Sequence, residues 1–125
     1  MSKDLENKRS EENSILAEQF LSAVKAGNIE EVNKILQTTQ GKELTNYVDK
    51  SGNTALTYAA EFNHITILEL LLKNNHNPQL LNHSNNEVLT ALMIAVIDDN
   101  YKAVELLLEA GANPNHTERK KRQLL

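Results

Sequence analysis

Apolar residues along the chain recur at helical spacing, in pairs of short segments separated by polar turns. Between residues 90 and 115, two apolar stripes flank a polar turn at residues 98–100. The stripe positions are Leu92, Ala95 and Val96 before the turn and Val104, Leu107 and Leu108 after it. Gly111 and Pro114 then end the second segment, because glycine tolerates the left-handed backbone that follows a helix and proline cannot continue one. The pattern predicts two short helices joined by a tight turn.

The same pattern returns with a period of 36 residues. Thr54 to Leu56 lie 36 positions before Thr90 to Leu92, and residues 70–72 lie 36 positions before residues 106–108. One further step back reaches a less regular copy, whose matching positions are Phe20, Ala23, Val32 and Leu36. A fixed period in this range is typical of stacked-repeat proteins, in which each unit covers the apolar face of its neighbour.

The residues of these copies resemble the pattern of a known family. The segments Thr54–Ala60, Asn63–His64, Leu70–Leu72 and Gly111–Asn115 are similar to the ankyrin repeat, whose pattern runs Thr-Pro-Leu-His, Ala-Ala, Gly-His, Leu-Leu-Leu and Gly-Ala-Asp-x-Asn. The resemblance covers roughly residues 14 to 116. It implies an all-α fold, a solenoid of stacked helix-turn-helix units joined by long hairpin-like loops.

The chain departs from the family pattern in three respects. Ala55 and Ala91 replace a proline at the helix start, Thr57 and Met93 replace a histidine, and Val88 stands where the earlier copy has the turn residue Gly52. The period is also longer than the family's usual 33 residues, so about three residues are inserted in each connection. The shape of the loop tips is therefore open.

We expect one domain of three repeats, at residues 14–48, 49–84 and 85–116. Residues 1–13 alternate in charge and are predicted to be a flexible polar leader or an N-terminal cap. Residues 117–125 read as a basic tail or as the start of a truncated repeat. The run Arg119–Arg122 is either a targeting or anionic-surface signal or simply a solvated tail.

Metal chemistry finds little support. The chain has no cysteine, which excludes disulfides, thiolate catalysis and cysteine-based zinc sites. The histidines are His64, His76, His83 and His116. The resemblance gives His64 a structural role, bonding neighbouring loops, and no two of the others share a helix face at ligand spacing. We predict no metal site and no cofactor.

Catalysis finds no better support. Asp98 and Asp99 are adjacent carboxylates, but neighbouring helix residues face different directions, so the pair more simply ends one helix and starts the next. No phosphate-binding glycine loop, nucleophile elbow or Ser/His/Asp set can be assembled. We predict that the protein is not an enzyme.

Charge and hydropathy narrow the partners and the location. The net charge is −4, of which the leader carries −1 and the tail +3, so the repeat body carries −6. An acidic body repels phosphate backbones, which argues against nucleic acid. Neither a secretory signal nor a membrane span is recognisable. We expect a cytoplasmic monomer.

The resemblance places partner binding on the concave face of the stack. The positions expected on or beside that face are Lys25, Lys50, Asn53, Tyr58, Glu61, Phe62, Leu89, Ile94, Ile97 and Asp98. Phe62, Leu89 and Ile97 are apolar where solvent contact is expected, which is typical of a binding surface. The alternative is that Leu80 and Leu81, in the long second connection, fold over this patch and bury it.

The sequence thus favours a non-catalytic module that binds a protein partner. The alternative is a structural spacer or a fragment of a longer repeat array. The asparagine-rich composition, together with the resemblance, also suggests an ankyrin effector of a host-associated microbe, which would act inside the host cell.

Overall fold

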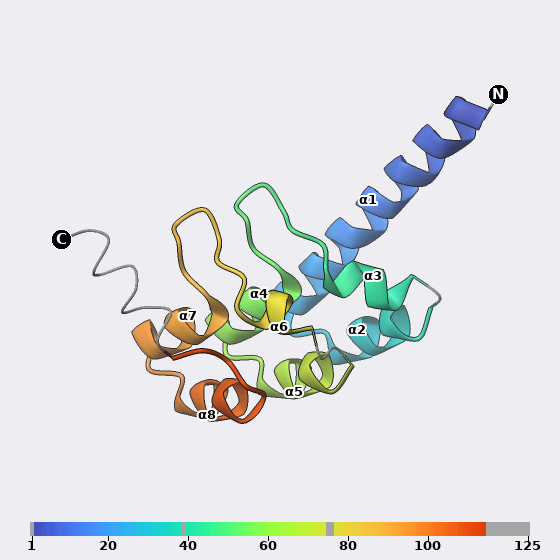
Figure 1. Ribbon diagram of the computed structural model, residues 1–125. Helices are drawn as coiled ribbons and strands as arrows, with labels where there is room; N and C mark the ends of the chain where they lie inside the picture. The colour runs from blue at the N-terminus through green and yellow to red at the C-terminus, as the bar shows by residue number, and fades with distance from the viewer. Residues whose placement is uncertain (1, 39, 75–76, 115–125) are drawn as a thin grey trace.

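The computed structural model describes residues 2–38, 40–74 and 77–114, and they form a stack of helix pairs (Figure 1). The helices are α1 (Ser2–Ala26), α2 (Ile29–Leu36), α3 (Gly41–Thr45), α4 (Ala55–Glu61), α5 (Ile65–Asn74), α6 (Pro78–Leu81), α7 (Ala91–Ile97) and α8 (Tyr101–Glu109). The described residues include no strand. The predicted all-α stack of helix pairs is confirmed.

The helices form two layers. The first helices of the pairs, α1, α4 and α7, pack side by side as an inner layer, and α2, α5 and α8 pack side by side as an outer layer. The short helices α3 and α6 lie in the long connections. Two loops rise on the same side of the stack, hairpin 1 (residues 46–54) and hairpin 2 (residues 82–90) (Figure 1). The hairpins and the inner layer together bound the concave face.

Each helix pair is joined by the same tight turn. The residue that leaves the first helix has a left-handed backbone in every copy, with φ of 73° at Gly27, 55° at Asn63 and 57° at Asp99. These positions are 36 residues apart, and glycine, asparagine and aspartate are the residues that adopt this conformation at least cost. Asp98 is the C-cap residue of α7, so the prediction that the Asp98–Asp99 pair ends one helix is confirmed, whereas the expectation that it starts the next was wrong, because Asn100 occupies the N-cap position of α8.

Threonine begins two of the inner helices. The hydroxyl oxygen of Thr54 accepts from the Thr57 amide at 3.3 Å, and that of Thr90 accepts from the Met93 amide at 3.2 Å. Thr57 also returns a bond, because its hydroxyl oxygen accepts from the Thr54 amide at 2.8 Å. These N-caps satisfy amides that no helical carbonyl can reach, so α4 and α7 begin properly without the family's proline.

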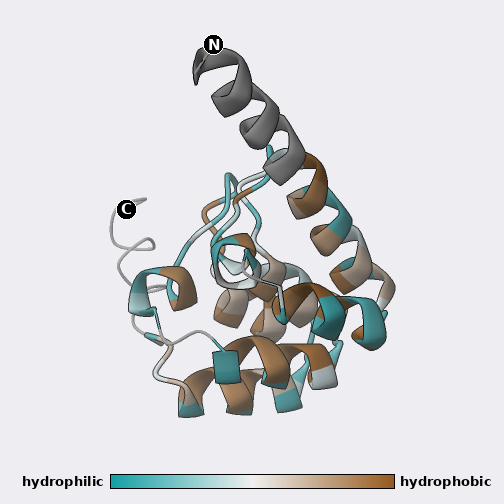
Figure 2. Cartoon of the chain, turned by 90° about the vertical axis from the view of Figure 1, so that its right-hand side faces the viewer, coloured by the Kyte–Doolittle hydropathy of each residue, from teal (hydrophilic) through white to brown (hydrophobic). Residues whose placement is uncertain are grey.

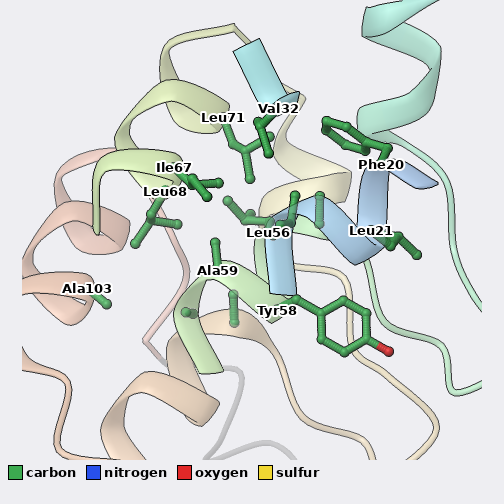
Figure 3. Close-up of a cluster of buried hydrophobic side chains, with 14 of the residues drawn as sticks. Phe20, Leu21, Val32, Leu56, Tyr58, Ala59, Ile67, Leu68, Leu71 and Ala103 are labelled. Atoms are coloured by element: carbon green, nitrogen blue, oxygen red, sulfur yellow. The ribbon is translucent and has the colours of Figure 1, made fainter. Parts of the chain in front are cut away.

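The core lies between the two layers. Figure 3 shows side chains from several helices in one cluster, among them Phe20, Leu56 and Leu68. Hydrophobic residues are concentrated on the paired helices (Figure 2). Ala59 and Ala95, which are fully buried and 36 residues apart, leave room for the inner helices to approach closely. Each large side chain buried in this way contributes about 1.5–3 kcal/mol to folding.

The chain before the first repeat is helical. Helix α1 begins at Ser2, so residues 2–13, predicted to be a flexible polar leader or an N-terminal cap, continue the first helix of repeat one without a break. The stretch lacks glycine and proline and is rich in lysine and glutamate, which favour helix. The tail at 117–125, with Arg119–Arg122, lies outside the described residues, as do His76 and His116. No helix in the described part is long and apolar enough to cross a bilayer.

Candidate partner-binding face

The two hairpin tips have the same closed geometry. In hairpin 1 the Asp49 Oδ1 atom accepts from the amides of Ser51 at 3.0 Å and Asn53 at 2.9 Å. In hairpin 2 the Asn85 Oδ1 atom accepts from the equivalent amides, 36 residues later, at 2.9 Å and 3.0 Å. A backbone bond also closes each tip, from the amide of residue 49 or 85 to the carbonyl four residues on. An Asx side chain thus makes a regular tip in both copies, which answers the open question of loop shape.

The middle of each tip has a left-handed backbone. Gly52 has φ of 80°, and Val88, at the equivalent position, has φ of 67°. This conformation costs an L-residue about 1–2 kcal/mol, and β-branched side chains are especially poorly suited to it. The bonds from Asn85 and its neighbours hold Val88 in place, so hairpin 2 keeps the shape of hairpin 1 despite the missing glycine.

Hydrogen bonds join the two hairpins to each other. The Asn86 amide donates to the Ser51 carbonyl at 3.0 Å, and the Asn86 side-chain Nδ2 donates to the Lys50 carbonyl at 2.8 Å. The His83 Nε2 atom lies 2.9 Å from the Gly52 carbonyl oxygen. In the sequence, asparagine stands out only as an abundant residue type. In the structure, the bonds of Asn86 join the two hairpins to each other.

The inner layer and hairpin 1 meet at Tyr58. The Lys25 Nζ atom lies 4.3 Å from the centroid of the Tyr58 ring, within cation–π range. The Tyr58 hydroxyl donates a short hydrogen bond to the Asp49 carboxylate. Burial, followed by this bond to Asp49, raises the pKa of Tyr58 to about 12. The phenol therefore stays protonated at neutral pH and keeps donating, which fixes hairpin 1 to α4.

His64 has the structural role that the resemblance implied. Its Nε2 atom lies 2.9 Å from the Lys25 carbonyl oxygen, 39 residues earlier in the chain. Its ring also stacks on Phe62, with the centroids 6.3 Å apart, and Phe62 stacks on Tyr58 at the same distance. A row of rings therefore runs along the end of α4 and reaches the neighbouring repeat.

The predicted site residues divide into an exposed and a covered group. Lys25, Lys50, Glu61, Phe62, Ile97 and Asp98 are exposed, and Asn53 and Leu89 are half-buried. Tyr58 and Ile94 are only 8% and 6% exposed, so their placement on the binding surface was wrong. They occupy equivalent positions in α4 and α7, 36 residues apart.

The alternative in which the second connection buries the apolar patch is also wrong. Leu80 and Leu81 line a separate cavity of about 520 Å³, together with Leu71 and Leu72 of α5. Phe62 stays 48% exposed and Ile97 63% exposed. The apolar side chains at the ends of α4 and α7 are thus available to a partner.

A second hollow lies at the far end of repeat three, and the sequence analysis missed it. This terminal pocket, of about 280 Å³, is lined mainly by Leu89, Met93, Val96, Ile97, Leu108 and Pro114. This pocket is indicated by a difference in exposure between equivalent positions, which only the stacked structure reveals. Val24, Ala60 and Val96 occupy the same helix position, yet the first two are fully buried and Val96 is 56% exposed. Leu89 and Ile97 therefore belong to a pocket, not to a flat patch.

The described residues offer no cluster of three or more His, Asp or Glu side chains that could hold a metal ion. Their two histidines, His64 and His83, both bond backbone carbonyl oxygens. The His64 imidazole holds repeat two to the Lys25 carbonyl of repeat one, and the His83 imidazole holds hairpin 2 to the Gly52 carbonyl of hairpin 1.

Comparison with known proteins supports the resemblance. A family model described as ankyrin repeats, in three copies, matches residues 20–118. No curated protein matches the chain. The match covers most of the chain and coincides with the 36-residue period and the stacked helix pairs, so the protein belongs to the ankyrin-repeat family.

Proposed function

We propose that this protein is a non-catalytic interaction module whose concave face binds a partner protein. Ankyrin repeats are generally protein–protein interaction modules, and the family is typically non-catalytic. The observation that carries the proposal is the exposure of Phe62 and Ile97, at the ends of two inner helices, beside the charged residues Glu61 and Asp98. Apolar anchors within a polar rim are the usual composition of a binding surface.

The rigidity of the face supports the same function. Bonds from Asn86 join the two hairpins, and the bond from Tyr58 ties hairpin 1 to α4. The bond between His64 and the Lys25 carbonyl ties the start of α5 to the end of α1. A surface that is already ordered loses little conformational entropy when a partner binds. A larger share of the free energy gained from contacts is then available as affinity.

The test is a capture experiment from cell lysate with three forms of the protein. Wild type is compared with the double variant Phe62→Ala, Ile97→Asp and with the control Lys34→Ala, Thr66→Asp, whose exposed sites lie on the outer helices α2 and α5. Circular dichroism first establishes that all three remain helical. We expect a partner to be captured by wild type and by the control but not by the double variant. Equal capture by all three would refute the concave face as the site.

A second candidate function, a spacer within a longer repeat array, is favoured by the end of repeat three. Val96 is exposed there at a position that is fully buried in the other two repeats. The outer face of a terminal repeat is normally polar. This function predicts self-association through the last helix pair, which analytical ultracentrifugation would detect and Val96→Asp would abolish.

We further propose that the protein acts as a monomer in the cytoplasm, and that nucleic acid is not its partner because the repeat body is acidic. A cytoplasmic monomer would sediment at 14.0 kDa and would fractionate with cytosolic markers. If it is an effector of a host-associated microbe, the cytosol concerned is that of the host.

A further inference from the structure

We propose that the terminal pocket receives one large apolar side chain of an extended partner segment that carries lysine or arginine on both sides of that residue. This inference goes beyond the proposed function, because the pocket lies at the end of the stack and shares only Leu89 and Ile97 with the residues predicted for the concave face. It follows from the lining of the pocket, the distribution of charge among the repeats, and the length of α7.

The lining of the pocket selects an apolar group. Met93 and Leu92 form its floor, and Val96, Ile97 and Leu108 are exposed around it. The volume of about 280 Å³ accommodates a single aromatic or large aliphatic side chain. Filling the pocket would remove the Val96 side chain from water, as the equivalent Val24 and Ala60 side chains already are in the other two repeats. Burying an apolar side chain in this way is favourable.

Charge selects what flanks that group. Residues 85–114 carry five carboxylates and one lysine, a net charge of −4, whereas residues 14–48 and 49–84 carry −1 each. Lys102 lies 3.8 Å from Glu105, so the single cation is already paired. The remaining carboxylates include Glu87, Asp98 and Asp99, which are exposed and form no ion pair with another described residue. Most of the acidity of the body therefore belongs to the repeat that forms the pocket.

The exposed carboxylates flank the pocket-lining residues of α7 in the sequence. Asp98 and Asp99 directly follow Ile97, and Glu87 lies two residues before Leu89, at the other end of α7. The seven residues of α7 span about 10 Å, at 1.5 Å per residue. Four steps of an extended chain cover about 13 Å, at 3.3 Å per residue. A segment of the form basic, any, apolar, any, basic is therefore long enough to run the length of α7 with its apolar residue at the pocket.

The same charges disfavour the main competing occupant, a second copy of this end. A two-fold dimer through the terminal pocket would place two surfaces of net charge −4 against each other. Like charges brought together in an interface are costly. A positively charged partner would be attracted by the carboxylates that would repel a second copy.

The test is fluorescence anisotropy with the 125-residue chain and labelled synthetic peptides. The probe has the core Arg-Ser-Phe-Ser-Arg, one control replaces both arginines by glutamate, and the other replaces phenylalanine by serine. We expect the probe to bind at least about tenfold more tightly than either control, and its affinity to fall as salt is raised. Equal binding of the three peptides, or none, would overturn the inference.

Variants of the protein locate the site. Val96→Asp should abolish binding of the probe, and Asp98→Asn with Asp99→Asn should weaken it and flatten its salt dependence. Asparagine tolerates the left-handed backbone at residue 99, so the turn is preserved. The control Glu30→Gln, Glu69→Gln removes two exposed carboxylates from the outer layer and should change nothing. Binding that survives Val96→Asp would place the peptide elsewhere and refute the inference.

Two further outcomes would assign the pocket to another occupant. A dimer that Val96→Asp dissociates would assign it to a second copy. Probe binding that appears only with Leu124→Ser and Leu125→Ser would assign it to the chain's own C-terminal sequence, where Arg119–Arg122 precede two leucines. If the probe fails while the lysate partner is still lost with Phe62→Ala, the proposed function stands and only this inference fails.

Discussion

Replacing Gly52 by alanine tests whether the contact between the hairpins stabilises the fold. Gly52 has φ of 80°, and a Cβ atom built there would lie 2.6 Å from the Asn86 Oδ1 atom and 2.7 Å from the Asn86 amide nitrogen. Atoms cannot remain that close, so hairpin 2 must move away. That movement breaks the bonds from Asn86 to the carbonyls of Ser51 and Lys50.

The expected loss of stability has three parts. The left-handed backbone costs alanine about 1–2 kcal/mol more than glycine. Each of the two broken hydrogen bonds contributes a net of about 1 kcal/mol. The stiffer unfolded chain of the alanine variant offsets about 0.4–1 kcal/mol. We therefore expect Gly52→Ala to lower the free energy of unfolding by about 2–3.6 kcal/mol, or the Tm by about 10 °C for a chain of this length.

Gly111→Ala is the matched control. Gly111 has φ of 101°, but the nearest atom to its built Cβ is Leu81 Cδ2 at 4.0 Å, an ordinary contact. This variant carries the backbone strain without the overlap, and we expect a loss of about 1 kcal/mol. The difference between the two variants isolates the contact between the hairpins.

The measurement is urea unfolding followed by circular dichroism at 222 nm, with thermal melting as a second readout. Two variants that melt at nearly the same temperature would refute the claim that Asn86 couples the hairpins. A double variant Gly52→Ala, Asn86→Ala gives an independent check. Since the bonds of Asn86 are already lost in Gly52→Ala, the second change should cost less than about 0.5 kcal/mol more.

Three further predictions concern the residues that hold the repeats in place. Tyr58→Phe removes the donor to Asp49 and should cost about 1–2 kcal/mol. Because the folded pKa of Tyr58 is raised from 10.0 to about 12, its contribution is complete below pH 10 and is lost as the pH rises toward 12; the variant should lose less stability over that range, as measured by unfolding in urea at each pH. Thr54→Ala removes the N-cap of α4 and should cost about 1 kcal/mol, whereas Thr54→Ser should cost much less. His64→Ala breaks the bond to the Lys25 carbonyl and should cost about 1–2 kcal/mol in urea unfolding, because that carbonyl loses its partner.

Each of these has a result that would contradict it. A pH dependence in Tyr58→Phe identical to that of wild type would show that Tyr58 titrates no differently in the folded and unfolded chain. Equal stability of Thr54→Ala and Thr54→Ser would show that the Thr54 hydroxyl does not stabilise the start of α4. Unchanged stability of His64→Ala would mean that the imidazole adds nothing to the union of repeats one and two.

The local sequence by itself determined the paired helices and their order. The spacing of Leu92, Ala95 and Val96, the polar turn at residues 98–100, the stop at Gly111 and the 36-residue period predicted the helix pairs, which the structure contains, but not the short helices α3 and α6 or the helix before repeat one. The bonding role of His64 was implied by the resemblance to the family. The paired helices depend on residues within one or two turns of each other and on a pattern that recurs in every copy. Both can be recognised from the order of residues alone.

The tertiary structure alone decided which side chains a partner can reach. Tyr58 and Ile94 were expected near the surface and are buried, whereas the terminal pocket was not anticipated at all. Val24, Ala60 and Val96 have the same place in their helices and differ only in whether another repeat covers them. Exposure in a stack is a property of the neighbour, and no pattern within a single repeat records which neighbour is there.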